Sequence, residues 1–248
     1  MSKIVDYDVA GYESFRQRAR NTELSGNQKS GFPDDLRNGQ SEIILADIDS
    51  KLPAFGRPGA RVLDIGIGCS DLSRAIIARA SERQQNLVVI DSPEVLAEIQ
   101  DGPSITKIAG PFPDCLARGP IGPFDAVLSY SVLQYVFSEA NLNNFIESAL
   151  LLLDETSGAL LLGDIPNSSM RKRFFESNAG RLHHAEHYPD RPPPNVRFNA
   201  LEPRQIDDTV VLAILARARA AGFQAFVLPQ GAQLPMANRR EDILIKRP

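Results

Sequence analysis

The sequence predicts an α/β protein with a seven-stranded, mostly parallel sheet, helices on both faces and an antiparallel hairpin at one edge. The first observation is that short apolar segments alternate with segments of helical periodicity from residue 60 onward. Such alternation builds a parallel sheet, because each helix carries the chain back to the start of the next strand. The second is that the last two apolar segments are joined only by residues 229–241, which show no helical pattern. We therefore expect those two strands to pair antiparallel.

The expected strands and helices follow from apolar spacing. The strands are expected, in chain order, at Arg61–Ile65, Leu87–Ile90, Ser104–Ala109, Phe124–Ser129, Ala159–Leu162, Phe223–Leu228 and Asp242–Lys246. Apolar residues recur with helical spacing from about Ser70, across residues 142–153 and from Asp208 to Ala221, which predicts amphipathic helices there. Strands buried under helices on both faces account for the continuous apolar runs.

Two segments depart from this alternation. Residues 1–59 are polar and contain turn signals, so we expect an N-terminal leader of helix and loop, and a main domain over residues 60–248. Residues 166–205 separate the fifth strand from its helix, show no clear helical periodicity and include a proline-rich run at residues 190–194. Connections of this length are usually functional or mobile, and we expect this insertion to lie on the substrate side of the main domain.

The composition is that of an ordinary globular protein. Of the 248 residues, 43% are hydrophobic and 23% are charged, and the formal net charge is −4. These values argue against a disordered chain and against a nucleic-acid partner. Cys69 and Cys115 are too few for a disulfide framework. No signal-peptide pattern and no apolar run near the roughly 18 residues of a membrane span are present. We expect a cytoplasmic protein with no membrane partner, and the oligomeric state is not indicated.

A glycine loop joins the first strand to the first main-domain helix. Gly66 and Gly68 let the backbone turn sharply and let a ligand lie against it,, and Ser70 can cap the helix that follows. Asp91 ends the second strand, where its carboxylate can accept the two hydroxyls of an adenosine ribose. Ser92 is placed to cap the next helix.

Asp64 separates two cofactor classes that such a loop could bind. A carboxylate two residues before Gly66 would lie near the pyrophosphate of NAD, which is unfavourable, but it suits a cationic ligand with an ammonium and a sulfonium,. The third glycine of the dinucleotide fingerprint is also missing, because that position is Asp71,. An NAD-dependent oxidoreductase is therefore the weaker alternative.

Several motifs together resemble the class I, Rossmann-like S-adenosylmethionine-dependent methyltransferases. They are Asp64-x-Gly66-x-Gly68, Asp91, Phe124–Ser129, Ser131–Val136 and Gly158–Leu162. The resemblance implies an enzyme that binds S-adenosyl-L-methionine at the carboxyl ends of the first four strands. The residues that it implies as cofactor-binding are Asp64, Gly66, Gly68, Ser70, Asp91, Ser92, Ser129 and Tyr130. Ser70 departs from the family, which commonly has glycine at that position.

The ends of the fourth and fifth strands should lie on either side of the transferred methyl group. Ser129-Tyr130-Ser131 is not the Asn/Asp-Pro-Pro-Tyr/Phe segment by which similar enzymes hold an exocyclic amine of a nucleic-acid base. We therefore expect a small-molecule methyl acceptor and favour O-methylation. Asp164 could act as a general base or orient the acceptor, and it could equally cap the loop after the fifth strand.

The insertion supplies further candidates for the acceptor site. His183, His184 and His187 are all the histidines of the chain, and with Glu186 they spell the zinc pattern H-x-x-E-H,. The match is short, so we expect no metal and consider His183 or His184 as a base. Arg171 and Arg173, with His187 and Tyr188, could hold an anionic or sugar-like acceptor; the alternative is a solvated helix face. The remaining hypothesis is a methyltransferase-like binding subunit that does not catalyse methyl transfer.

Overall fold

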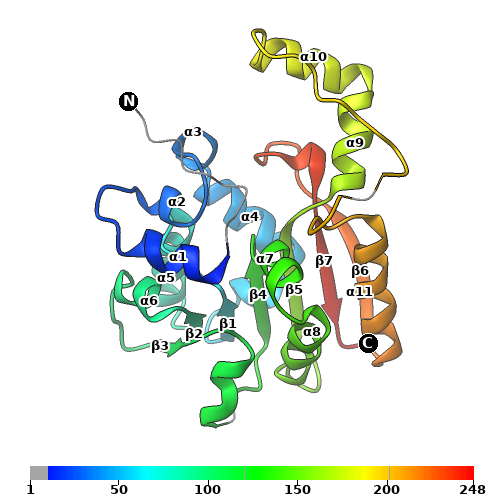
Figure 1. Ribbon diagram of the computed structural model, residues 1–248. Helices are drawn as coiled ribbons and strands as arrows, with labels where there is room; N and C mark the ends of the chain where they lie inside the picture. Colours follow the sequence, from blue (N-terminus) through cyan, green and yellow to red (C-terminus); the bar gives the residue numbers. More distant parts are fainter. Residues whose placement is uncertain (1–10, 120, 201) are drawn as a thin grey trace.

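The computed structural model describes residues 11–119, 121–200 and 202–248 (Figure 1). Its centre is one sheet of seven strands in the order β3-β2-β1-β4-β5-β7-β6. Strands β1 to β5 pair in parallel, and β7 runs antiparallel to both β5 and β6. The strands are β1 Arg61–Ile65, β2 Asn86–Asp91, β3 Ile105–Ala109, β4 Ala126–Tyr130, β5 Ala159–Pro166, β6 Gln224–Pro229 and β7 Arg240–Lys246. The predicted fold class is confirmed.

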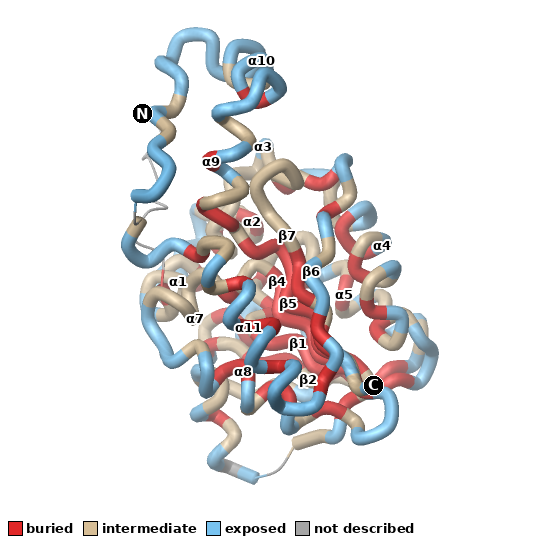
Figure 2. The backbone as a smooth tube through the Cα atoms, turned by 90° about the vertical axis from the view of Figure 1, so that its right-hand side faces the viewer, coloured by how far each residue is buried: buried red, intermediate tan, exposed pale blue. Residues whose placement is uncertain are grey.

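Alternate residues of the central strands face two separate cores. Leu63 and Val127 point to the core under helices α8 (Leu142–Leu151) and α11 (Asp208–Ala220). Their neighbours, such as Val62, point to the core on the other face, which α4 (Ser41–Lys51) and α5 (Asp71–Glu82) cover. The central strands are therefore buried on both faces, which is why they read as continuous apolar runs. Figure 2 shows the buried strands inside a layer of half-buried helices.

Short helices complete the edges of this frame. Helix α6 (Pro93–Ala97) follows β2, and α7 (Leu133–Glu139) follows β4. Three 3-10 turns lie at Pro53–Gly56 (η1), Asp114–Arg118 (η2) and Ala237–Arg239 (η3). The last of these turns lies in the connection from β6 to β7, so that connection is not wholly irregular. The hairpin pairs antiparallel as predicted.

Residues 1–10 of the predicted leader lie outside the described residues, and from residue 11 it folds as α1 (Tyr12–Ala19), α2 (Gly26–Lys29) and α3 (Asp34–Arg37) before it reaches α4. Ion pairs attach it to α6 and to the residue that follows α6: Arg16 binds Glu94 at 2.8 Å and Lys29 binds Glu98 at 2.6 Å. Helix α4 differs from these three helices because its apolar side chains belong to the core on one face of the sheet. The first three helices thus lie on the main domain, whereas α4 belongs to it.

The insertion forms two helices, which the sequence reasoning missed. Helix α9 (Ser168–Glu176) and helix α10 (Asn178–His187) project from the carboxyl end of β5 (Figure 1). Both are capped locally, since the Asn167 side chain accepts from the Met170 N–H and the Ser177 hydroxyl accepts from the Gly180 N–H. Most of their side chains are exposed or half-buried, so no apolar stripe was available for the prediction. We call α9 and α10 the arm.

Candidate active site

A cavity of about 340 Å³ lies at the carboxyl ends of β1, β2 and β4. One side is formed by residues 64–70, from the end of β1 through the β1–α5 loop, and another by residues 130–132 at the end of β4. The leader supplies aromatic and basic side chains to the remaining side: Tyr12, Phe15, Lys29, Phe32 and Arg37. Ligands of open parallel sheets bind at this edge, and the volume suits a small molecule.

Glycine is required at two positions of the β1–α5 loop. Gly66 has φ +80° and Gly68 has φ +66°, in the left-handed region that side chains rarely adopt,. A Cβ at Gly66 would lie 2.6 Å from a methyl group of Val132, and one at Gly68 would lie 2.9 Å from the Ser30 hydroxyl. The loop therefore presents bare backbone to the cavity.

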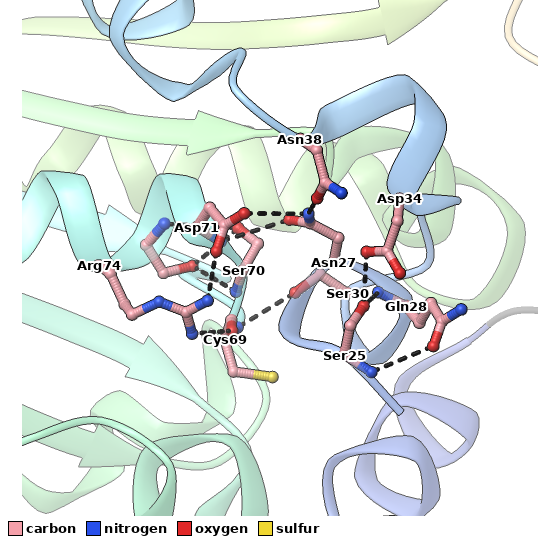
Figure 3. A network of polar contacts seen from close by, with 11 residues as sticks. Ser25, Asn27, Gln28, Ser30, Asp34, Asn38, Cys69, Ser70, Asp71 and Arg74 are labelled. Carbon is pink, nitrogen blue, oxygen red and sulfur yellow. Dashed lines mark hydrogen bonds and ion pairs between the residues drawn. The ribbon is translucent and has the colours of Figure 1, made fainter. Parts of the chain in front are cut away.

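The backbone N–H groups that lead into α5 are already hydrogen-bonded to side chains, and Figure 3 shows the contacts of Cys69 and Asp71 with the leader. Each N–H group from Gly68 to Asp71 donates to a side-chain oxygen, in order those of Asp91, Ser30, Ser73 and Asn27, at 2.9, 3.1, 3.1 and 3.3 Å. In dinucleotide-binding folds these N–H groups bind the pyrophosphate. Here two of the four N–H groups donate to leader side chains, those of Ser30 and Asn27. These N–H groups are not free for a pyrophosphate, which argues against a dinucleotide at this loop.

Asp64 and Asp91 put two carboxylates beside the cavity. Burial, with a smaller contribution from Asp91, raises the pKa of Asp64 to about 8. Burial also raises the pKa of Asp91 to about 6, although the Gly68 and Ser92 N–H groups stabilise its charged form. Among the ion pairs of the described residues, none involves either carboxylate. A bound cation would lower both pKa values, so the site is electrostatically suited to a positive ligand.

The structure brings six of the eight predicted cofactor residues together. Those lining the cavity are Asp64, Gly66, Gly68, Ser70, Asp91 and Tyr130. Ser92 and Ser129 are not among the lining residues. The Ser92 hydroxyl accepts from the Val95 N–H and caps α6, and the buried Ser129 hydroxyl donates to the Ile65 carbonyl at 3.2 Å. Both of these side chains support the loops that form the site.

A strained pair of residues follows β4 and interrupts β5. Ser131 has φ +61° and Asp164 has φ +57°, and the Ser131 hydroxyl donates to the Asp164 carboxylate. Such conformations in residues other than glycine persist only where the surroundings enforce them, and they gather at functional sites. Ser131 lines the cavity, whereas Asp164 is buried behind it with 1% exposure.

Two arginines hold the Asp164 carboxylate. Arg37 from the leader binds it at 2.6 Å, and Arg240 at the start of β7 binds it at 2.7 Å. Burial would raise the pKa of Asp164, but the Arg240 and Arg37 guanidiniums hold it below its usual range. The carboxylate accepts from side chains and not from the backbone of the loop after β5, so the interpretation as a cap of that loop is wrong.

Sequence reasoning placed Ser131 beside the methyl group only as part of the segment Ser129-Tyr130-Ser131, and it assigned no site role to Arg37. Arg37 lies 127 positions from Asp164 in the chain, and an arginine in a polar leader carries no local sign of such a contact. Ser131 was visible only as part of the motif after β4. Its positive φ depends on the tertiary setting and could not be predicted from its type.

The predicted acceptor residues lie on the arm, away from the cavity lining. None of Arg171, Arg173, His183, His184, His187 and Tyr188 is among the lining residues. Arg173 forms an ion pair with Asp208 at 2.5 Å. The His183 and His187 rings stack with centroids 4.2 Å apart. Over the described residues, no group of three histidine, cysteine or acidic side chains could hold a metal ion.

Solved structures of methyltransferases match nearly the whole chain. The N-methyltransferase NodS from Bradyrhizobium japonicum WM9, in complex with S-adenosyl-L-homocysteine, is 13% identical, with 95% of this chain and 96% of that chain covered and a TM-score of 0.55. The plantazolicin methyltransferase BamL, with a triazolic desmethylPZN analog and the same cofactor product, is 14% identical, with coverages of 95% and 96% and a TM-score of 0.56. The fold is that of the class I methyltransferases.

A third methyltransferase structure agrees with this assignment. The precorrin-6y C5,15-methyltransferase from Geobacter metallireducens GS-15 is 13% identical, with 90% of this chain and 96% of that chain covered and a TM-score of 0.51. No family model matches the chain, and a search of curated proteins finds no match. The methyltransferase fold that the sequence motifs implied is confirmed. Among the described residues, no helix is long and apolar enough to cross a membrane.

Proposed function

We propose that the protein is an S-adenosyl-L-methionine-dependent methyltransferase that acts on a small molecule. The observation that supports this proposal most directly is the pair Asp64 and Asp91 beside the glycine loop, with raised pKa values and no ion-pair partner among the described residues. Asp91 would accept the ribose hydroxyls of the cofactor, and Asp64 would face its cationic amino-acid part. The occupied N–H groups of α5 remove the phosphate site that NAD would need.

For methyl transfer the protein needs mainly to align the acceptor with the donor and to provide a suitable electrostatic environment. The cofactor supplies a methyl group that is already activated on a sulfonium, and the enzyme must hold the acceptor in line with it. We infer that Ser131 and Arg37 border the acceptor because both line the cavity and both are fixed by Asp164. Asp164 then acts as a positioning residue, because a carboxylate held between two guanidiniums is a poor general base.

The acceptor is proposed to be a small molecule methylated on oxygen. Support for the size comes from the leader, whose side chains cover one side of the cavity and leave limited space. Support for oxygen comes from Ser129-Tyr130-Ser131 at the end of β4, which lacks the segment that holds an exocyclic amine. A role of His183 or His184 as base would require an acceptor that extends to α10. NodS is named an N-methyltransferase and BamL a plantazolicin methyltransferase, and these names leave the acceptor and the methylated atom open here.

Calorimetry tests whether the site binds the proposed cofactor or the alternative, NAD. S-adenosylhomocysteine and NAD are titrated into the wild-type protein and into the Asp91→Ala variant. We expect saturable binding of S-adenosylhomocysteine only, weakened in Asp91→Ala by about 1–3 kcal/mol because the ribose hydroxyls lose their acceptor. Binding of NAD in place of S-adenosylhomocysteine would overturn the proposal. A screen of small hydroxylated acceptors then tests methyl transfer itself, and cofactor binding without transfer to any acceptor would favour a non-catalytic subunit.

A further inference from the structure

A second cluster of cationic and aromatic side chains lies where helix α9 of the arm meets η3 in the β6–β7 connection. Helix α9 packs against η3. The guanidinium carbons of Arg171 from α9 and Arg239 from η3 each lie 5.7 Å from the centre of the Phe175 ring. Two separate parts of the chain, α9 and η3, thus place two guanidiniums at one aromatic side chain, which is a cation–π arrangement.

These two arginines differ from their neighbours in having no acidic partner. Arg173 binds Asp208 at 2.5 Å, Arg181 binds Glu176 at 3.0 Å, and Arg240 binds Asp164 at 2.7 Å. Within residues 11–119, 121–200 and 202–248, neither Arg171 nor Arg239 forms an ion pair with a carboxylate. Positive charge therefore accumulates at Phe175 and is not neutralised there.

Arg239 is the more constrained of the two. Its side chain is half-buried, and burial, with a further contribution from Arg240, lowers the pKa of its guanidinium. A half-buried cation without a counter-charge is unfavourable. His183 packs its ring edge-on to Phe174, with centroids 5.5 Å apart. Burial, then His187 and Arg239, lower the pKa of His183. The cluster as a whole therefore favours a bound anion.

The adjacent residues Arg239 and Arg240 connect this cluster to the cavity. Arg240, the residue next to Arg239, binds Asp164 and lies 5.9 Å from the ring of Phe32, which lines the cavity. Arg239 itself lies on Phe175 of the arm. The two adjacent arginines thus connect the proposed methyl-transfer site with the arm, at the sheet edge where ligands of such folds bind.

We propose that Arg171 and Arg239 bind a phosphate group carried by the methyl acceptor. The proposal rests on the proposed function and deepens it by naming the acceptor class. Each guanidinium offers paired N–H donors that match phosphate oxygens, and two of them compensate a dianion. Arg173, which the sequence grouped with Arg171, is excluded because Asp208 already neutralises it.

Phosphate binding is tested on the protein saturated with S-adenosylhomocysteine. Inorganic phosphate is titrated by calorimetry into the wild type, Arg171→Gln and Arg239→Gln, with Arg173→Gln as the matched control from the same helix as Arg171. We expect saturable binding in the wild type and in Arg173→Gln, weakened at least tenfold in the other two variants. Equal affinity in the wild type and Arg239→Gln, or no saturable binding in the wild type, would overturn the phosphate site. Binding of S-adenosylhomocysteine is measured in the same samples, so a failure of the proposed function is recognised separately.

The link to the acceptor needs a second measurement. Pairs of phosphorylated and unphosphorylated hydroxyl compounds are compared as acceptors by following the release of S-adenosylhomocysteine. We expect transfer to the phosphorylated member of a pair, with KM raised at least tenfold and kcat little changed in Arg239→Gln. Methyl transfer to the unphosphorylated member of a pair, with the same KM in Arg239→Gln as in the wild type, would show that the acceptor is not recognised through a phosphate group. This would hold even if inorganic phosphate binds.

Discussion

Asp64 shows at the residue scale how a binding site can cost stability. Burial raises its pKa to about 8 in the folded protein, against an ordinary value of 3.8 for an aspartate. A raised folded pKa means that the contribution of the group to stability is present below the unfolded pKa and is lost as the pH rises through about 8. At neutral pH the folded, ligand-free protein therefore bears the cost of keeping this carboxyl group neutral and buried.

The Asp64→Asn substitution removes that cost. We expect the ligand-free variant to be more stable than the wild type at pH 7.5 by about 1 kcal/mol or more, because one pKa unit corresponds to about 1.4 kcal/mol. The same variant should bind S-adenosylhomocysteine at least about tenfold more weakly, a trade of stability against function. Urea unfolding and calorimetry measure the two effects. A destabilised variant with unchanged affinity would contradict both parts.

The same carboxylates predict a pH dependence of binding. Asp64 and Asp91 are partly protonated in the free protein between pH 5.5 and 7.5, given pKa values of about 8 and about 6. The ammonium of S-adenosylhomocysteine favours the charged form of Asp64, and its ribose hydroxyls favour that of Asp91, so affinity should rise with pH in this interval, by about tenfold. Tyr12 also lines the site, but burial and Asp91 raise its pKa to about 12, so it stays neutral. A flat profile in the wild type, or the same slope in Asp64→Asn, would be inconsistent with this explanation.

The leader matters at the scale of elements because it completes the glycine loop. The Asn27 side chain accepts from the Asp71 N–H and donates to the Asp71 carboxylate at 3.1 Å and to the Asn38 side chain at 2.9 Å (Figure 3). Asn27 is 3% exposed. It thus joins α2, the chain after α3 and the N-terminus of α5.

Asn27→Ala should therefore loosen the leader from α5. We expect a loss of about 1–3 kcal/mol in stability, because buried partners are left unpaired, together with weaker binding of S-adenosylhomocysteine. Asn143→Ala on the exposed face of α8 is the matched control and should change neither. Chemical denaturation and calorimetry compare the three proteins. Wild-type affinity in Asn27→Ala would mean that the leader does not support the cofactor loop.

Elements could be predicted wherever burial imposes a pattern. The strands were found because both faces of the sheet are buried, and β1 (Arg61–Ile65) matches its expected bounds. The arm was read as irregular because its helices bury few side chains, and caps at Asn167 and Ser177 are weak signals alone. The cofactor loop was predictable because glycines and acids stand at fixed distances along the chain. The Arg37 contact was not, because it depends on how distant elements meet.

At the scale of the whole molecule, Asp164 joins the leader, the end of β4 and the edge hairpin. Arg37, Ser131 and Arg240 reach it from these three regions. Its lowered pKa means that the ion pairs stabilise the fold above the usual pKa of an aspartate, and that this contribution is lost as the pH falls through the lower folded pKa. The pKa shift of Asp164 is opposite in sign to that of Asp64, although both carboxylates are buried.

A double-mutant cycle between Arg37 and Asp164 tests whether this network couples the leader to the sheet. We expect Asp164→Asn to destabilise by about 3–5 kcal/mol, because the arginines are left buried without a counter-charge, and Arg37→Gln by less, because Arg240 still holds the carboxylate. The double variant should be more stable than the sum of the two losses predicts, with a coupling energy of about 1 kcal/mol or more. Urea unfolding of the four proteins measures it. Additive losses would show that the leader and β5 are energetically independent, and Arg37 would then have no role in fixing the acceptor site through Asp164.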